Sequence, residues 1–314
     1  MSRRPLVAVV GATATGKSDV AIALAEALGG EVVNADAYQV YRGLDVGTAK
    51  VGAEQRARVP HHLIDITEPE EPLTLARFLD AAQAALDDIW ARGVLPVLAG
   101  GSGQYVWALL EGWQVPRVAP NLVLRAELEA LASNEGAGAL LRRLGELDPE
   151  AASRLDPDNT RRIIRAIEVV IGTGRTLAAC QTRQPIDADV LVLGLRLSRD
   201  ELYARLDART DAMFDAGFVD EVRRLRAEGR GETQPVRGGV GYKEVSAYLD
   251  GEYDFDEAVR RMKNANHRLV RRQDAWFKQT DARIHWLDAG PDAAAGAIEQ
   301  AKSWLVGLRA APVS

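Results

Sequence analysis

The sequence predicts an α/β fold, in which helices cover a parallel β-sheet and an all-helical segment is inserted into the chain. Three observations lead to this prediction. Strand-like and helix-like patterns alternate over the first third of the chain, a glycine-rich loop joins the first strand to the first helix, and strand-like runs disappear after Pro116. Alternating strands and helices favour a parallel sheet, because each crossover helix packs on a face of that sheet.

The first third contains short apolar runs, each followed by small or polar residues. These runs predict buried strands at Leu6–Val10, Glu31–Asn34 and Val94–Leu98. Apolar residues at helical spacing predict helices at Asp19–Leu28 and at Leu73–Arg92, the second with Thr74 as its N-cap. Ligands of such folds bind at the carboxyl ends of the strands, so the residues that follow each strand are the first candidates for a site.

The middle of the chain has a different pattern. Helix-like segments follow one another with no strand between them, at Asn121–Leu131, Gly138–Leu147 and Thr160–Val170. Val190–Leu197 then resembles a strand and is expected to rejoin the sheet. We therefore expect a core domain made of residues 1–116 and 189–314, with a helical insertion domain at residues 117–188. Further helices are expected at Arg199–Ala216, Val219–Ala227, Tyr242–Leu249 and Asp256–Lys278.

The composition is that of an ordinary globular protein. Of the 314 residues, 47% are hydrophobic and 27% are charged, which argues against a disordered or fibrous chain. The single cysteine, Cys180, excludes an intrachain disulfide and a thiolate zinc cluster, and we expect it to be buried. No apolar run approaches the roughly 20 residues of a membrane span, so a cytoplasmic location away from membranes is expected. The net charge of −6 argues mildly against a nucleic-acid partner, although local clusters of cations matter more.

The residues after the first predicted strand match a phosphate-binding P-loop. The pattern Gly-x-x-x-x-Gly-Lys-Ser lies between a strand and a helix, as this motif requires. Its backbone N–H groups and the helix N-terminus attract phosphate, so we predict a P-loop NTPase-like core that binds a diphosphate or a nucleotide. Lys17 is expected to contact terminal phosphate oxygens, and Ser18 to hold Mg²⁺. The predicted phosphate-binding residues are Gly11, Ala12, Thr13, Ala14, Thr15, Gly16, Lys17 and Ser18.

Polar residues also follow the other predicted strands. Asp36 could bind Mg²⁺ through water, act as a general base, or simply cap a helix. In Gly100–Tyr105, the N–H groups and the Ser102 hydroxyl could contact phosphate or a base, or the glycines could only form a tight turn. For His61-His62 we expect a structural turn rather than a metal site, because the spacing of a histidine metal motif is missing.

Two stretches of the chain are rich in cations. Residues 154–183 contain six arginines and three acidic residues. Residues 260–278 contain seven lysines and arginines and one acidic residue, with Trp276 and Phe277 close by. Cations beside aromatic side chains suit a nucleic-acid backbone with stacked bases. A charged run is, however, more often the solvated face of a helix, and both interpretations stay open at this point.

Taken together, these motifs resemble one family, the tRNA dimethylallyltransferases, also called tRNA isopentenyltransferases, and its bacterial members in particular. The resemblance extends from about Pro5 to about Lys278, with the segments in the same order. A P-loop alone is shared with many kinases, whereas the whole series is specific. Besides Gly11–Ser18, the matching segments are Asn34–Tyr41, Gly47–Lys50, Pro60–Asp65, Gly100–Gly103, Leu110–Gly112, Arg162–Val169, Gly241–Glu244 and Arg271–Phe277.

The resemblance implies a reaction. A dimethylallyl group passes from dimethylallyl diphosphate to N6 of the adenine directly 3′ of the anticodon in tRNA, diphosphate is released, and Mg²⁺ is the cofactor. Asp36 is then the general base, with Lys17 and Ser102 as further catalytic residues, and no obligate protein partner is expected. The residues expected to contact the anticodon stem-loop are Asp36, Ala37, Tyr38, Gln39, Ser102, Arg125, Arg161, Arg162, Arg165, Arg268, Arg271 and Arg272.

The sequence departs from the family at several positions. Ala37 stands where serine is usual, Ser102 where threonine is usual, Arg271 where lysine is common, and His267 near a common arginine. Three other functions stay open: a kinase that binds ATP at the P-loop, a prenyltransferase for free adenine nucleotides, and a non-catalytic RNA-binding module. The segment around Asp36 and the basic helix argue against the kinase, and the cationic insertion argues against the free-nucleotide enzyme. The presence of Asp36, Lys17 and Ser18 together argues against the binding module.

Overall fold

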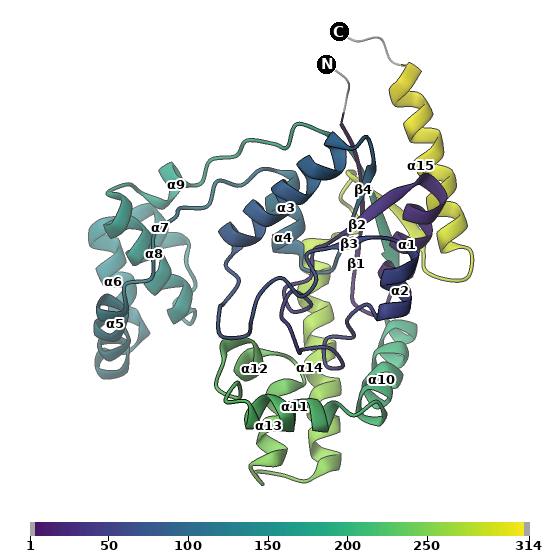
Figure 1. Ribbon diagram of the computed structural model, residues 1–314. Coiled ribbons are helices and arrows are strands. Elements are labelled where there is room, and N and C mark those ends of the chain that lie inside the picture. The colour runs from purple at the N-terminus through teal and green to yellow at the C-terminus, as the bar shows by residue number, and fades with distance from the viewer. Residues whose placement is uncertain (1–3, 311–314) are drawn as a thin grey trace. The chain divides into compact units, whose positions relative to one another are not determined.

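A six-stranded parallel sheet forms the centre of the core unit in the computed structural model, which describes residues 4–310 (Figure 1). All paired strands run parallel, in the order β3-β2-β4-β1-β5-β6. The strands are β1 Pro5–Gly11, β2 Gly30–Asn34, β3 His61–His62, β4 Leu95–Gly100, β5 Asp189–Arg196 and β6 Ile284–Asp288. The predicted α/β class, with a parallel sheet flanked by helices, is confirmed.

Helices cover both faces of the sheet. On one face, alternate strand residues such as Val7, Val9 and Leu193 pack against α1 (Lys17–Leu28) and α15 (Ala293–Ala310). On the other face, α3 (Leu75–Ala91) contacts β2 and β4, and α4 (Gly103–Leu110) packs against α3. The Thr74 hydroxyl accepts a hydrogen bond at the start of α3, as expected for its N-cap. Because both faces are covered, the central strands need the continuous apolar runs that predict them.

Two strands have no counterpart in the sequence prediction. β3 consists of His61 and His62, which pair in parallel register with Val32 and Val33, so the expected turn is wrong. β6 forms the opposite edge, and only one of its five residues is fully buried. Edge strands of this kind are short or half-exposed, and they therefore lack an apolar run that would reveal them.

A group of helices follows β5 and packs around Phe218, Tyr242 and Met262. The predicted segments match four of these helices to within two residues at each end. No predicted segment corresponds to the short α12, to α2 (Ala53–Arg58), or to α4 and α15. The helices are α10 Arg199–Asp215, α11 Phe218–Ala227, α12 Gln234–Gly238, α13 Tyr242–Leu249 and α14 Phe255–Trp276.

Residues 111–186 form a separate compact unit made of helices. Leu140, Leu144, Ile163 and Ile167 are fully buried in its core. Cys180 is buried as predicted, with 8% of its surface exposed. The helices of this unit are α5 Leu122–Glu135, α6 Ala137–Leu147, α7 Pro149–Arg154, α8 Thr160–Thr173 and α9 Leu177–Cys180.

The limits of this unit differ from the expected insertion at residues 117–188, because the chain entering the unit pairs with the chain leaving it. Trp113 forms an antiparallel bridge with Arg183, and the Gln114 N–H donates to the carbonyl of Thr182 at 2.9 Å. Residues 111–116 therefore group with the helices, and the core unit comprises residues 1–110 and 187–314.

The carboxylate of Glu31 in β2 is largely buried and forms an ion-pair cluster near the edge of the sheet with partly exposed partners. Its carboxylate accepts hydrogen bonds from the Arg92 guanidinium at 2.5 and 2.7 Å, and His62 Nε2 lies 2.7 Å from the same carboxylate. Hydrogen bonding to Arg92 lowers the pKa of Glu31 to about 2, with a smaller contribution from His62 and with burial acting in the opposite direction. The cluster ties β2, β3 and the end of α3 together.

Replacing Glu31 by glutamine should lower the free energy of unfolding by about 2 kcal/mol at neutral pH, because a charged hydrogen-bond acceptor is lost. The folded-state pKa of Glu31 lies below its ordinary value of 4.5, so its stabilisation is complete above pH 4.5 and is lost as the pH falls toward 2. Urea unfolding between pH 3 and 7 should therefore show a flatter pH dependence for the variant. Glu299→Gln, on the exposed side of α15, is the matched control. An unchanged pH dependence in Glu31→Gln would contradict this assignment.

Over residues 4–310, no helix is both long and apolar enough to span a membrane. In the same residues, no group of three or more His, Cys, Asp or Glu side chains could by itself hold a metal ion. The two adjacent histidines bind protein groups instead: His61 Nδ1 lies 2.8 Å from the Val59 carbonyl, and His62 contacts Glu31. A metal in this protein would therefore need oxygen ligands from elsewhere, including from a substrate.

Candidate functional site

The loop Gly11–Ser18 joins β1 to α1 at the carboxyl edge of the sheet. Its backbone needs glycine at two positions. Gly11 has a φ of 138°, and a Cβ there would lie 2.5 Å from the carbonyl oxygen of Leu195, whereas Gly16 has a φ of 86°. α1 begins at Lys17, so the unpaired N–H groups of its first turn belong to the same loop. This arrangement is suited to binding an anion.

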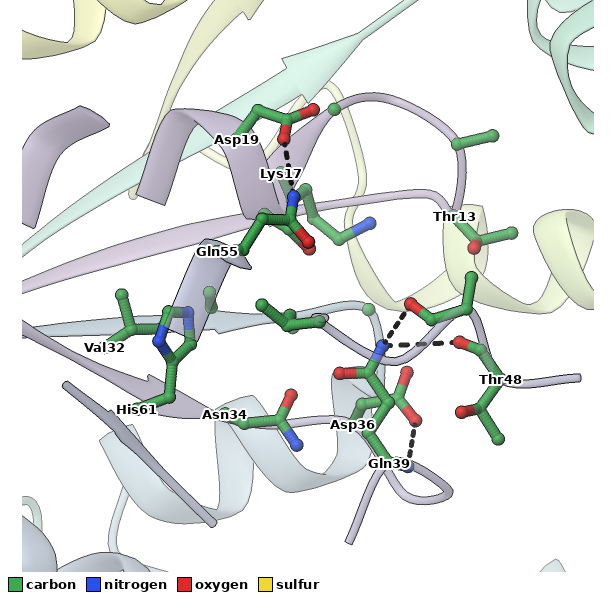
Figure 2. Close-up of a pocket in the computed structure, with 18 of the residues that line it drawn as sticks. Thr13, Lys17, Asp19, Val32, Asn34, Asp36, Gln39, Thr48, Gln55 and His61 are labelled. Atoms are coloured by element: carbon green, nitrogen blue, oxygen red, sulfur yellow. Dashed lines mark hydrogen bonds between the residues drawn. The ribbon is translucent and has the colours of Figure 1, made fainter. Parts of the chain in front are cut away.

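A cavity of about 220 Å³, which we call the phosphate cavity, opens beside this loop (Figure 2). The ends of β2 and β4 contribute Asn34 and Ala99 to its wall, and the loop that follows β2 contributes Asp36. Figure 2 shows Lys17 and Thr13 on one side of the cavity, with Asp36, Gln39 and Thr48 facing them. Side chains from several strand ends thus converge, as expected for a parallel sheet.

Lys17 is a half-buried cation in the phosphate cavity. Its ammonium donates a hydrogen bond to the Ala12 carbonyl at 2.5 Å. Burial, and secondly the nearby Arg209, lower the pKa of Lys17 to about 7, while the Asp36 carboxylate acts in the opposite direction. Since burial disfavours the charged ammonium, a ligand that brings negative charge gains a strong partner here.

Two polar side chains that line the phosphate cavity, Arg209 and Gln273, are not among the predicted site residues. Arg209, on α10, is partly buried, and its guanidinium lies 3.5 Å from the Thr13 hydroxyl. Burial lowers the pKa of Arg209, against the effect of Asp36. Gln273, on α14, is buried and contacts the loop at the Thr13 N–H. The motif Arg271–Phe277 contains Gln273 and could have pointed to it, whereas nothing in the sequence around Arg209 distinguishes it from other helix arginines.

Asp36 lies in a turn directly after β2 rather than at the start of a helix. Its Oδ1 accepts hydrogen bonds from the backbone N–H groups of Tyr38 at 2.8 Å and Gln39 at 3.2 Å. The next helix begins only at Ala53, so the helix-capping alternative is wrong. The Ala37 N–H donates to the Ser102 hydroxyl at 3.1 Å, which joins the loop after β4 to this turn. Within residues 4–310 the second carboxylate oxygen of Asp36 has no hydrogen-bond partner, which leaves it for a ligand.

A second cavity, of about 180 Å³, adjoins the first at Asp36. The two cavities share Thr13, Asp36, Thr48, Arg209 and Gln273. The rest of the second cavity combines apolar side chains from three helices with polar groups near Asp36. Its lining includes Ala37, Tyr38, Ser102, Leu206, Met213, Tyr242, Met262, Leu269 and Arg272.

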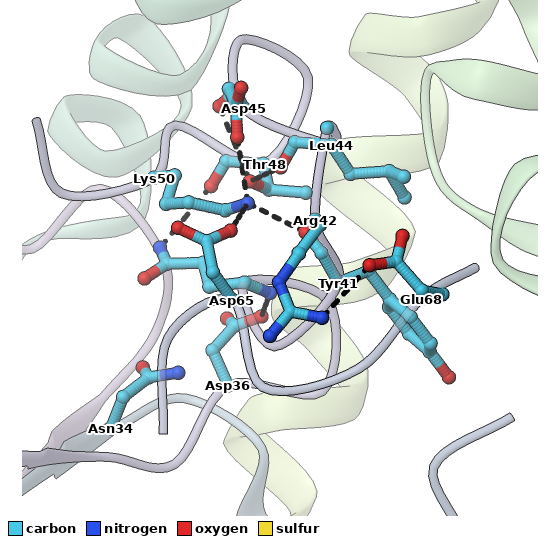
Figure 3. Close-up of polar contacts among 12 residues, drawn as sticks. Asn34, Asp36, Tyr41, Arg42, Leu44, Asp45, Thr48, Lys50, Asp65 and Glu68 are labelled. Atoms are coloured by element: carbon cyan, nitrogen blue, oxygen red, sulfur yellow. Dashed lines mark hydrogen bonds and ion pairs between the residues drawn. The ribbon is translucent and has the colours of Figure 1, made fainter. Parts of the chain in front are cut away.

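The loop Gly43–Lys50, which contributes Thr48 to both cavities, is held from one side by Lys50 (Figure 3). The Lys50 side chain is 3% exposed, and its ammonium donates to the Tyr41 carbonyl at 2.6 Å. It also binds the carboxylates of Asp45 at 2.7 Å and Asp65 at 2.6 Å. Its three hydrogen bonds join both ends of the loop to the segment that follows β3.

Glu221 of α11 holds the same loop from the other side. Its buried carboxylate accepts three consecutive backbone N–H groups, from Asp45 at 2.9 Å, Val46 at 2.7 Å and Gly47 at 3.2 Å. The Tyr242 hydroxyl donates to it at 2.7 Å. Four donors satisfy this buried charge, as burial of a carboxylate requires. The wall shared by the two cavities is therefore fixed by a residue that the sequence analysis did not single out.

The predicted RNA-contacting arginines of α14, Arg268, Arg271 and Arg272, are all exposed. Their spacing of three and four residues places them on one side of the helix. Arg272 also lines the second cavity. Near them, His267 stacks on Tyr203 with the ring centroids 4.0 Å apart, and so does not extend freely from the surface.

The four predicted arginines of the helical unit fall into two groups. Arg161 and Arg162 are exposed at the start of α8. Arg125 and Arg165 instead bind Glu168, whose side chain is fully buried, with closest N–O distances of 2.7 and 3.3 Å. These pairs leave 36% and 38% of the two arginine side chains exposed, so both have a structural partner besides any ligand.

Ser18, the predicted metal ligand, lies in the first turn of α1 and lines the phosphate cavity together with Asp36. Its hydroxyl makes no hydrogen bond within residues 4–310. Mg²⁺ prefers oxygen ligands, keeps several waters, and is commonly bound by one or two protein oxygens plus substrate phosphates. The Ser18 hydroxyl could therefore hold a Mg²⁺ ion that is bound together with the oxygens of a diphosphate.

The chain is similar to proteins of one kind. A family model described as IPP transferase matches residues 39–280, and a second model, isopentenyl transferase, matches residues 5–59. A tRNA dimethylallyltransferase of Roseiflexus sp. (strain RS-1) is 49% identical over 275 residues, which are 88% of this chain and 90% of the relative. One from Chloroflexus aggregans is 45% identical over 287 residues, or 91% of this chain and 97% of the relative.

Two solved structures have the same fold. A full-length tRNA isopentenylpyrophosphate transferase from Bacillus halodurans aligns with a TM-score of 0.71 and 38% identity, covering 98% of this chain and 97% of the other. A eukaryotic dimethylallyltransferase acting on tRNA aligns with a TM-score of 0.82 and 26% identity, covering 97% of this chain and 80% of the other. With these neighbours, the predicted P-loop NTPase-like core is confirmed.

Proposed function

The chain belongs to the IPP transferase family, and from this premise we propose that it transfers a dimethylallyl group from dimethylallyl diphosphate to tRNA. The acceptor is N6 of the adenine directly 3′ of the anticodon. The observation that carries the proposal is the place of Asp36, whose side chain lines both the phosphate cavity and the second cavity. A carboxylate between two adjoining cavities can act where two substrates meet.

We assign the prenyl donor to the phosphate cavity. The N–H groups of Gly11–Ser18 and the cations Lys17 and Arg209 suit a diphosphate, and Asp36 faces them across the cavity. Mg²⁺, held by Ser18 and the diphosphate oxygens, would neutralise part of the charge on the leaving group. The P-loop then binds a leaving group rather than a phosphate that is itself transferred.

The adenine belongs in the second cavity. Tyr38, Met262 and Leu269 supply the aromatic and apolar surface against which a planar base packs. The Ser102 hydroxyl and the Asp36 carboxylate supply the polar groups for the edge of that base. With alanine at position 37, where serine is usual in the family, the chain has no hydroxyl there for a polar contact to RNA.

The reaction proceeds by attack of N6 on the allylic carbon of the donor. The C–N bond forms while the C–O bond breaks, and the electron pair of that bond leaves with the diphosphate. Asp36 accepts the proton that N6 loses. Lys17 and Arg209 stabilise the negative charge that grows on the leaving oxygen. Ser102 holds the Asp36 turn through the Ala37 N–H, which keeps the base in place.

The proposal is tested by mass spectrometry of nucleosides after incubation with labelled dimethylallyl diphosphate. Label should enter an unmodified anticodon stem-loop, at the adenosine 3′ of the anticodon, and should not enter free AMP. Incubation with labelled ATP in place of the prenyl donor is the control and should leave the RNA unlabelled. Transfer from ATP alone would support the kinase alternative, and equal use of AMP would support a free-nucleotide prenyltransferase.

Replacing both Arg271 and Arg272 by alanine should weaken tRNA binding and reduce its dependence on salt. Each phosphate contact contributes roughly 0.7 to 0.9 to the slope of log affinity against log salt concentration, so the slope should fall by about 1.5. Binding of a labelled stem-loop at several salt concentrations measures this. The matched control is Arg309→Ala, an exposed cation near the end of α15. An unchanged slope in the double variant would show that these arginines do not bind phosphate.

A further inference from the structure

Gln273 links two parts of the site that are far apart in the sequence. Its side-chain oxygen accepts a hydrogen bond from the Thr13 N–H at 2.8 Å, and its side-chain nitrogen donates to the Gly101 carbonyl at 3.0 Å. The residue is 8% exposed and lies on α14. A backbone N–H can only donate and a carbonyl can only accept, so the orientation of the amide is fixed by its two partners.

The two partners of Gln273, Thr13 and Gly101, lie next to the groups that take part in the reaction. Thr13 belongs to the phosphate-binding loop, at the leaving-group end of the site. Gly101 precedes Ser102, whose hydroxyl accepts the Ala37 N–H next to Asp36. A continuous series of contacts therefore runs from the phosphate-binding loop through Gln273 to the turn that carries the general base.

We propose that Gln273 is a positioning residue, which fixes the separation between the bound diphosphate and the carboxylate of Asp36. The inference rests on the proposed function, because it needs a leaving group at the P-loop and a base at Asp36. Gln273 acts through the loops it holds. The Thr13 N–H donates its hydrogen bond to Gln273 and is therefore not available to the diphosphate. The diphosphate is bound instead by the remaining N–H groups of the loop, together with Lys17 and Arg209.

The space around the Gln273 amide is tight, which supplies a second, independent way to disturb it. A Cβ placed on Gly101 would lie 2.5 Å from Gln273 Nε2 and 3.4 Å from the Gly11 carbonyl oxygen. Gly101 does not have a positive φ, so alanine is compatible with its backbone. Gly101→Ala therefore displaces the amide without altering Gln273 itself.

Loss of the bridge should affect kcat more than donor binding. Gln273→Met keeps most of the side-chain volume and removes both hydrogen bonds. A misplacement of about 1 Å between reacting groups can cost about 100-fold in rate, so kcat should fall about 10- to 100-fold. The KM for dimethylallyl diphosphate and the affinity for inorganic diphosphate with Mg²⁺ should stay within about threefold, because the other ligands of the diphosphate remain.

The decisive experiment is a double-mutant cycle of Gly101→Ala and Gln273→Ala, read out as kcat and KM with the stem-loop acceptor. Gly101→Ala alone should lower kcat about tenfold, and should have almost no further effect once Gln273→Ala has removed the clash. Asn264→Ala, an exposed change on the same helix, should match the wild type. Binding of inorganic diphosphate, measured by calorimetry, shows that each variant is folded.

Strictly additive effects, or losses confined to KM, would overturn the assignment of Gln273. So would an unchanged kcat in Gln273→Met. These outcomes are distinct from failure of the proposed function, in which the wild-type protein itself would transfer no dimethylallyl group to the stem-loop.

Discussion

Replacing Asp36 by alanine should lower kcat by about two to four orders of magnitude, the usual contribution of a positioned general base. The adenine amine is a poor nucleophile, and without the carboxylate its proton has no acceptor at the point where the two cavities adjoin. Binding of the stem-loop should change by less than about threefold, since the arginines of α14 are untouched. Single-turnover rates and equilibrium RNA binding, measured on the same preparations, separate the two effects.

Replacing Asp36 by asparagine distinguishes loss of the proton acceptor from loss of the turn that Asp36 stabilises. Asparagine keeps an oxygen that can accept the N–H groups of Tyr38 and Gln39, so the turn should persist, but it cannot accept a proton from N6. We therefore expect a loss of kcat close to that of the alanine variant. Asp292→Asn, an exposed change before α15, is the control for the substitution itself. Full activity of Asp36→Asn would rule out the role of general base.

Replacing Lys17 by methionine should lower kcat/KM for dimethylallyl diphosphate by about 100- to 1000-fold, comparable to the loss of one strong donor to a developing oxyanion. Methionine has a similar length and suits a half-buried position, so the fold should be retained. Inorganic diphosphate, which resembles the leaving group, should also bind more weakly. Steady-state kinetics with varied donor and calorimetry with inorganic diphosphate give the two values.

Lys302→Met, on the exposed side of α15, makes the same chemical change away from the site and should leave both values unchanged. If Lys17→Met altered the KM for the stem-loop while the donor parameters stayed the same, Lys17 would serve the acceptor rather than the leaving group. Equal diphosphate affinity in the variant and the wild type would contradict its place beside the phosphate.

The sequence predicts the central strands and most of the long helices because their physical signals are local, whereas the 18-residue α15 is not predicted. β1, β4 and β5 are buried on both faces and need continuous apolar residues, and helices as long as α10 and α14 show helical spacing over several turns. The two edge strands lack such a signal, since β3 has two half-buried histidines and β6 is mostly half-exposed. The limits of the insertion are missed because antiparallel pairing between its two connecting segments is a long-range contact.

The residues of the candidate site also fall into two groups, those that the local sequence reveals and those that it does not. The P-loop and Asp36 follow strands and are recognisable from their immediate neighbours. Arg209, Glu221 and Gln273 reach the site from helices, and their partners lie 196, 174 to 176 and 260 residues away in the sequence. Each is an ordinary residue of an amphipathic helix until the fold brings it to a loop. Only the tertiary structure selects such residues from the many similar ones in the chain.

The way Glu221 holds the wall between the cavities has a consequence for redesign. It binds Asp45, Val46 and Gly47 through their main-chain N–H groups, so the hold does not depend on the side chain at Val46. At Gly47, by contrast, a Cβ would meet the ring of Phe218 at 2.1 Å. Inserting or deleting one residue in this loop would leave a buried carboxylate short of donors. Engineering of this loop should therefore keep its length constant and leave Gly47 unchanged.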